Sequence, residues 1–111
     1  MKAGPHWPLV RVKELVACGK LFVQRTRALD FFSSPREALA TVKEVLVGLE
    51  LGSFAHSVKL TWDVADVYGV VIEEEGWYLK ITVDEEEPEL VVISFHPLER
   101  PLRTRGGVIE P

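Results

Sequence analysis

The chain has 111 residues, of which 47% are hydrophobic and 27% charged, as expected for one globular domain over residues 1–111. One cysteine excludes an intramolecular disulfide framework, and no apolar run reaches the roughly 20 residues of a membrane span. The formal charge of −4 is unevenly distributed, because residues 1–59 carry nine basic and five acidic residues (net +4) and residues 60–111 carry four basic and twelve acidic residues (net −8). With an N-terminus that lacks the apolar core of a signal peptide, these features predict a cytoplasmic protein without membrane contact.

Two amphipathic helices are predicted in the first half. Apolar residues recur at helical spacing over about 8–18, and Gly19 is placed to end that helix. Ser34-Pro35-Arg36-Glu37 is a capping box with proline in the first helical position. This box predicts a second helix over 35–47.

A short β-prone run, Leu21-Phe22-Val23, lies between the two predicted helices. Arg25 and Arg27 follow it and would share one side of an extended segment, where they either grip phosphate or are solvated. After the second helix, residues 53–57 predict a turn from which His56 projects.

The second half predicts antiparallel strands. Two weaker β-prone segments, around residues 58–62 and 67–72, precede two strong runs over 77–83 and 90–96. The acidic connector between the strong runs contains Pro88 and cannot be a central strand, so these two runs predict a hairpin.

The predicted hairpin has two different faces. Alternation places Val91, Ile93 and Phe95 on one face of the second strand and Val92 on the other. Directly opposed side chains lie about 4.5–5.5 Å apart at Cβ, so one face would collect a phenol, an ammonium, a hydroxyl and an imidazole. The predicted cross-strand pairs are Tyr78 with His96, Lys80 with Ser94, and Thr82 with Val92.

Together these elements predict an α+β fold, with two helices packed on a twisted, mainly antiparallel sheet of about four to five strands. Residues 97–111 hold three prolines and a Gly106-Gly107 pair, and they predict an extended, partly mobile C-terminal tail.

The side chains favour general acid–base chemistry without a metal or cofactor. His6, His56 and His96 lack the short paired spacing of zinc sites, and no phosphate-binding glycine loop occurs. Histidine and tyrosine beside fixed positive charge suit cleavage of an RNA phosphodiester by its own 2′-hydroxyl. The alternative is a half-exposed sheet face without chemistry. Trp62 and Trp77 are predicted to be core residues.

Several short stretches carry a resemblance to a known family. The most specific are the Tyr-Leu-Lys-Ile-Thr-Val strand and the Ile-Ser-Phe strand that follows it. The chain resembles the MqsR family, the mRNA interferase toxins of bacterial type II toxin–antitoxin pairs. This resemblance implies a RelE-like α+β fold, metal-independent endoribonuclease activity on mRNA, and neutralisation by a cognate antitoxin. The stretches concerned are Pro5-His6, Val12-Lys13-Glu14-Leu15-Val16, Val47-Gly48-Leu49, Asp66-Val67-Tyr68, Tyr78-Leu79-Lys80-Ile81-Thr82-Val83 and Val92-Ile93-Ser94-Phe95.

The resemblance also implies site residues. The catalytic tyrosine of the family and the lysine two residues later match Tyr78 and Lys80. Two further family lysines correspond to His56 and His96, and a family glutamine corresponds to Ala65. Histidine gains and loses a proton near neutral pH, so the two exchanges keep ionisable groups in place but change their kind.

Two functions follow as hypotheses. The first is an endoribonuclease toxin in which His56, Tyr78, Lys80 and His96 are catalytic. In this hypothesis Lys59, Arg103 and Arg105 contact the RNA backbone, and the partners are an mRNA substrate and a cognate antitoxin. The second is a catalytically silent member of the same fold that binds an antitoxin or another partner protein.

Overall fold

The computed structural model describes residues 4–24 and 30–111. Arg25 and Arg27 therefore lie outside the described residues. The described part contains two α-helices, the short 3-10 helix η2 and seven strands. Their bounds are α1 (Leu9–Ala17), β1 (Leu21–Val23), α2 (Pro35–Val47), η2 (Leu51–Ser53), β2 (Phe54–Lys59), β3 (Val64–Ile72), β4 (Glu75–Asp84), β5 (Glu89–Pro97), β6 (Leu102–Thr104) and β7 (Gly107–Ile109).

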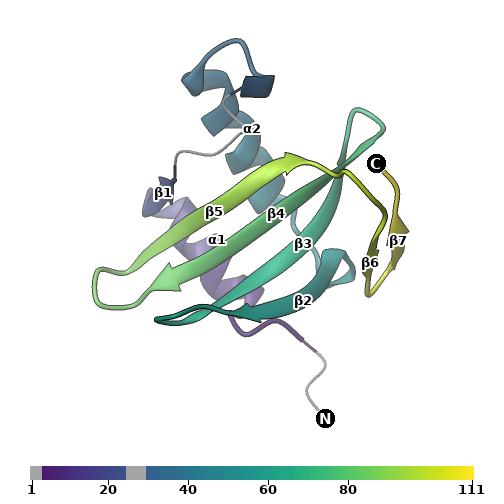
Figure 1. The fold of residues 1–111 in the computed structure, drawn as a ribbon. Helices are drawn as coiled ribbons and strands as arrows, with labels where there is room; N and C mark the ends of the chain where they lie inside the picture. The colour runs from purple at the N-terminus through teal and green to yellow at the C-terminus, as the bar shows by residue number, and fades with distance from the viewer. Residues whose placement is uncertain (1–3, 25–29) are drawn as a thin grey trace.

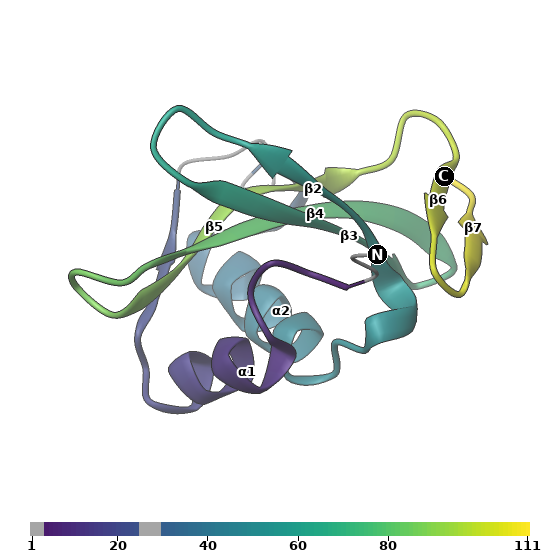
Figure 2. The same ribbon diagram turned by 90° about the horizontal axis from the view of Figure 1, so that it is seen from below.

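Five of the strands form one mixed sheet in the order β1-β5-β4-β3-β2. β1 runs parallel to β5, and every other neighbouring pair is antiparallel. Both helices lie against the same face of this sheet, and the small β6–β7 sheet stands at one end (Figures 1 and 2). The predicted α+β class, with two helices and a mainly antiparallel sheet, is confirmed. Neither helix in the described ranges is long and apolar enough to cross a membrane.

The helices begin and end where local sequence predicts. Ser34 Oγ accepts a hydrogen bond from the Glu37 N–H at 3.1 Å, while the Glu37 carboxylate reaches back to the Ser33 N–H, one residue before the expected partner. At the end of α1, Gly19 has φ of 75°, and the Lys20 N–H donates to the carbonyl of Leu15. Both features belong to a Schellman motif, which needs a residue that tolerates positive φ.

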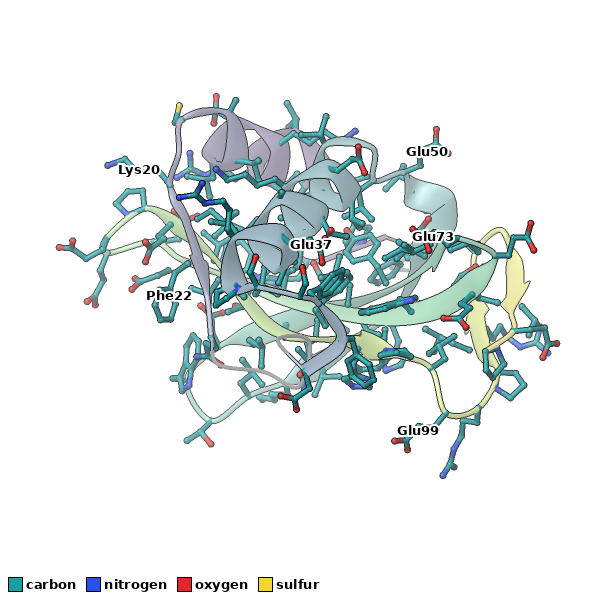
Figure 3. All side chains as sticks on the ribbon, turned by 90° about the horizontal axis from the view of Figure 1, so that it is seen from above. Lys20, Phe22, Glu37, Glu50, Glu73 and Glu99 are labelled. Atoms are coloured by element: carbon teal, nitrogen blue, oxygen red, sulfur yellow. The ribbon has the colours of Figure 1, made fainter. Side chains whose placement is uncertain are left out.

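The helix-facing side of the sheet carries the core. Side chains from α1, α2, β3, β4 and β5 make one apolar cluster, and Figure 3 shows the side chains on the ribbon. Because successive side chains of a strand alternate, the neighbours of the β4 core residues point to the opposite side, which we call the open face. The buried core residues are Trp7, Val12, Leu15, Val16, Val42, Leu46, Leu49, Phe54, Tyr68, Trp77, Leu79, Ile81, Val83, Leu90, Val92 and Phe95.

The β4–β5 register matches the prediction at one end only. Tyr78 pairs with His96 and Lys80 with Ser94, as predicted, but Thr82 pairs with Val91 instead of Val92. The register shifts by one residue next to Lys80, so β5 carries a bulge there. A bulge reverses the alternation beyond it. The predicted grouping of Val91 with Phe95 is therefore wrong, because Val92 and Phe95 share the core face.

Two further predictions around β2 are wrong. The segment expected to be a turn, 53–57, lies mostly in the edge strand β2. Trp62 stands in the β2–β3 connection with 62% of its surface exposed, whereas Trp77 is 6% exposed and lies in the core as predicted. Apolar alternation identified both segments as β-prone but could not indicate which tryptophan would be covered.

The C-terminal residues form a hairpin that packs on the end of the sheet. A Cβ built on Gly69 would lie 2.9 Å from Leu102 Cδ2 and 3.1 Å from Thr104 Cγ2. A Cβ on Gly76 would collide with the backbone oxygen of Glu110. Two glycines on neighbouring strands therefore leave the room in which β6 and β7 rest. From the sequence we expected an extended, partly mobile tail over 97–111, and the packing of this hairpin on the sheet was not predicted.

Tyr68 is a tyrosine of β3 whose ring lies in the core. It is fully buried, and its hydroxyl has no hydrogen-bond partner among the residues that the structure describes. Burial, and to a lesser degree the charge of Asp66, raises the pKa of Tyr68. The neutral phenol is therefore the form that the folded protein holds.

Tyr68→Phe is expected to raise the free energy of unfolding at pH 7 by about 1 kcal/mol, because it removes an unsatisfied buried hydroxyl. The folded-state pKa lies above the unfolded value of about 10, so stability that is complete below pH 10 is lost as the pH rises further. Between pH 7 and pH 10.5, the free energy of unfolding should therefore fall less for the variant than for the wild type. Urea unfolding at pH 7 and pH 10.5 measures both effects, and a lower stability of the variant at pH 7 would show that the hydroxyl is bonded.

Candidate functional site

The candidate site lies on the open face, where β4 and β5 run side by side. Tyr78 and Lys80 project from β4, directly opposite His96 and Ser94 of β5. Opposed Cβ atoms lie about 5 Å apart, and the two pairs are about 7 Å apart along the strands. Three of the four predicted catalytic residues are thus brought together in an area small enough to contact one phosphodiester group.

Tyr78 and His96 are in contact through their rings. Their centroids are 5.0 Å apart and the ring planes differ by 11°, a stacked arrangement. His96 Nδ1 lies 2.9 Å from the carbonyl oxygen of Pro97. A carbonyl oxygen only accepts hydrogen bonds, so Nδ1 carries the proton in this contact. In the neutral imidazole, Nε2 is then the atom that can take a proton from a substrate.

Tyr78 is half-buried, and this burial raises its pKa above the ordinary tyrosine value. Its phenol therefore stays protonated at neutral pH and acts as a hydrogen-bond and proton donor. Lys80 is also partly buried and supplies a positive charge one cross-strand pair away. A neutral donor, a proton acceptor and a fixed cation are the groups that phosphodiester cleavage needs.

A cavity of about 280 Å³ opens beside the stacked rings. We call it the Tyr78 cavity. One wall is formed by Tyr78 and His96, and the other by the segment that leads from β5 into β6. Its lining residues are Tyr78, His96, Leu98, Glu99, Arg100, Pro101 and Leu102.

His56 lies on the same face but not in the same place. On the open face it pairs with Val67, which in turn pairs with Lys80, so β3 separates it from the β4 residues. At the usual strand spacing of about 4.8 Å, His56 and His96 are roughly 15 Å apart across the sheet. The structure therefore separates the two histidines by more than one reacting group can bridge.

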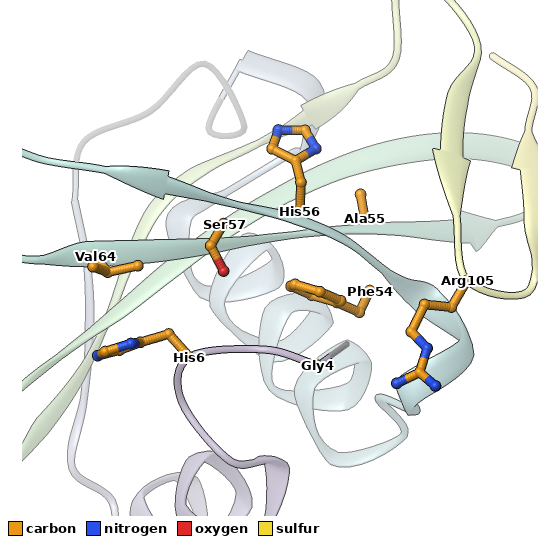
Figure 4. Close-up of a pocket in the computed structure, with 8 residues that line it drawn as sticks. All are labelled: Gly4, His6, Phe54, Ala55, His56, Ser57, Val64 and Arg105. Carbon is orange, nitrogen blue, oxygen red and sulfur yellow. The ribbon is translucent and has the colours of Figure 1, made fainter. Parts of the chain in front are cut away.

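Figure 4 shows the surroundings of His56 on the edge strand β2. His56 projects to one side of the strand, while Phe54 and Ser57 project to the other. A second cavity of about 470 Å³ lies between β2 and the N-terminal segment, and Gly4, His6 and Arg105 also line it. This groove is distinct from the Tyr78 cavity.

The predicted RNA-binding residues are exposed but do not line the Tyr78 cavity. Lys59 ends β2 at the sheet edge, and Arg105 lines the groove beside β2. Arg103 alternates with residues that face Gly69, so it points away from the sheet. The arginine at the cavity is Arg100, which was not among the predicted residues. Three arginines follow His96 in the tail, and nothing in the sequence indicates which of them would lie beside Tyr78.

Within residues 4–24 and 30–111, no group of three His, Cys, Asp or Glu side chains is arranged to hold a metal ion. No protein-family model matches the chain, and no curated protein matches its sequence. The resemblance to the MqsR family therefore rests on the stretches quoted above.

Proposed function

We propose that this protein is an endoribonuclease that cleaves mRNA and acts as the toxin of a toxin–antitoxin pair. The observation that carries the proposal is the stacked Tyr78–His96 pair beside Lys80 on the open face. The resemblance to the MqsR family supports the same activity, because Tyr78 and Lys80 match its catalytic tyrosine and lysine.

The reaction uses the RNA's own 2′-hydroxyl as the nucleophile. His96 Nε2 takes the 2′-OH proton while the 2′-oxygen attacks phosphorus. Tyr78 gives its proton to the departing 5′-oxygen, and Lys80 offsets the charge that develops on the phosphorane. The products are a 2′,3′-cyclic phosphate and a free 5′-hydroxyl. The Tyr78 phenolate then regains a proton as the His96 imidazolium loses one, which resets both groups.

Each role follows from the environment of the residue. The Pro97 carbonyl fixes the tautomer of His96, so the basic nitrogen faces away from the backbone. Burial keeps Tyr78 protonated until the stronger base, the leaving alkoxide, forms beside it. All the transferred protons move between these side chains and the RNA, so the chemistry requires no metal ion.

A cleavage assay in the presence of EDTA tests the proposal. Purified wild-type protein is incubated with a long mRNA and compared with a Tyr78→Phe, His96→Gln double variant. The wild type should release fragments that end in 2′,3′-cyclic phosphate, and the double variant should be slower by at least about 100-fold. Equal residual cleavage by the two proteins would mean that a contaminating nuclease cuts the RNA, and it would refute the proposed activity.

A second candidate function is partner binding without catalysis. An apolar groove of about 290 Å³ runs between β1 and α2, and Phe22 and Leu39 on its walls are 51% and 39% exposed. Such a surface suits a partner protein. Normal growth of a bacterial host that holds large amounts of folded protein, without any antitoxin, would favour this candidate over the nuclease.

A further inference from the structure

The Tyr78 cavity is built by the C-terminal hairpin, not by the sheet alone. Leu102 of the hairpin packs against Gly69 of β3. Gly69 is in turn the cross-strand partner of Tyr78 on the open face. The Leu98 N–H also donates to the carbonyl of Gly76 at 2.9 Å, which fixes the start of the connecting segment. The wall opposite the stacked rings is therefore held in place by packing and a backbone hydrogen bond.

We propose that the Tyr78 cavity is a nucleobase pocket that holds the base next to the scissile phosphate and selects the RNA sequence that is cut. This inference rests on the proposed nuclease function and deepens it. Its parts are the ring surfaces of Tyr78 and His96, the apolar side chains of Leu98 and Leu102, and the guanidinium of Arg100.

The size and lining of the cavity favour a single flat ring system. Its volume of about 280 Å³ lies just below the usual range of small-molecule sites, which is about 300–1,000 Å³. Proteins that recognise single-stranded RNA stack unpaired bases on aromatic side chains and read their edges by hydrogen bonds. Tyr78 and His96 offer the aromatic surface, and Leu98 and Leu102 offer apolar walls.

Charge at the rim favours a nucleotide over an apolar peptide side chain. Arg100 is exposed at the cavity, and a guanidinium binds phosphate in a bidentate manner. The phosphate that follows the bound base would lie between Arg100 and the His96–Lys80 region, which is where the proposed chemistry needs it.

The test uses two variants of exposed residues at the cavity. Arg100→Gln removes the guanidinium, and Pro101→Trp fills the cavity. Arg36→Gln, which makes the same charge change on an exposed position of α2, is the matched control. Binding of the four nucleoside 3′-monophosphates is followed by NMR shifts of the full-length protein, and cleavage sites on one long RNA are mapped for every variant.

The wild type should bind one or two of the four nucleotides best, with shifts at Tyr78 and His96. Arg100→Gln should weaken this binding about tenfold, Pro101→Trp at least as much, and Arg36→Gln not at all. The set of cleavage sites should change with Pro101→Trp. Nucleotide binding at the cavity without any RNA cleavage would support the pocket and refute the nuclease. RNA cleavage at unchanged sites by both cavity variants, with unchanged KM, would overturn the pocket and leave the nuclease standing.

Discussion

Tyr78→Phe is expected to lower the rate of RNA cleavage by about 100-fold or more while leaving the fold intact. The substitution removes only the phenolic hydroxyl, and general acid catalysis by one side chain contributes about 10²–10⁴ in rate. The ring stays in place to stack on His96, so RNA binding should change little and the loss should appear mainly in kcat. Single-turnover cleavage of a fixed RNA measures the effect.

The chain provides a matched control for this variant. Tyr68→Phe makes the same chemical change on the neighbouring strand, but the Tyr68 side chain lies in the core and not on the open face. It should cleave RNA at the wild-type rate. Two tyrosine variants with equal activity would contradict the assignment of Tyr78 to the reaction.

A modified substrate separates proton donation from phosphate binding by Tyr78. An RNA with sulfur in place of the leaving 5′-oxygen releases a thiolate, which needs no proton. If Tyr78 is the general acid, Tyr78→Phe and the wild type should cleave this RNA at similar rates. A persistent 100-fold difference would instead make Tyr78 a ligand of the phosphorane.

The sequence predicted the cross-strand pairing at the candidate site because this pairing depends on local strand geometry. Alternation places Tyr78 and Lys80 on one face of β4, and only one register brings Ser94 and His96 opposite them. The bulge next to Lys80 was not predictable, because no glycine or proline marks it in the sequence. It does not disturb the candidate site, since the Tyr78–His96 and Lys80–Ser94 pairs lie on the same side of the shift.

Contacts between distant segments decide what the sequence could not show. The tail is rich in proline and glycine, which locally indicates mobile chain, and its strands form because Gly69 and Gly76 leave room for them. Likewise, His56 and His96 both stand where the MqsR family, which the chain resembles, has lysines, but their separation depends on β2 lying at the sheet edge. Strand order is not encoded in local alternation, so neither Arg100 nor the distance between the histidines could be inferred.

Because His56 and His96 lie on different strands, far apart across the sheet, the two histidines have different roles in the proposed nuclease. His96 is beside Tyr78 and within the reach of one phosphodiester, whereas His56 lies beyond β3 on the edge strand. An extended RNA strand that crosses the open face from the Tyr78 cavity would pass Lys80 before it reaches His56. His56 is therefore placed to contact RNA beyond the cleaved linkage, and the groove that contains Arg105 adjoins it.

The largest effect on stability is expected for Asp66→Ala. Asp66 is fully buried on β3, and its carboxylate accepts hydrogen bonds from the His6 N–H at 3.0 Å, the Trp7 N–H at 2.8 Å and the Ser57 hydroxyl at 2.7 Å. These bonds tie the N-terminal segment and the edge strand β2 to the centre of the sheet.

Removing the carboxylate leaves the buried Trp7 N–H and two part-buried donors without their acceptor, and an unsatisfied buried group costs about 1–3 kcal/mol. Asp66→Ala should therefore lower the free energy of unfolding by about 3 kcal/mol or more, measured by urea unfolding at pH 7. Ser57→Ala, which deletes one of the three bonds at an exposed position, is the matched control and should cost clearly less. A loss below about 1 kcal/mol for Asp66→Ala would mean that solvent replaces the carboxylate easily. Because Asp66 points away from the open face, the folded variant should still cleave RNA at a temperature well below its Tm, which separates this anchoring role from the chemistry of Tyr78 and His96.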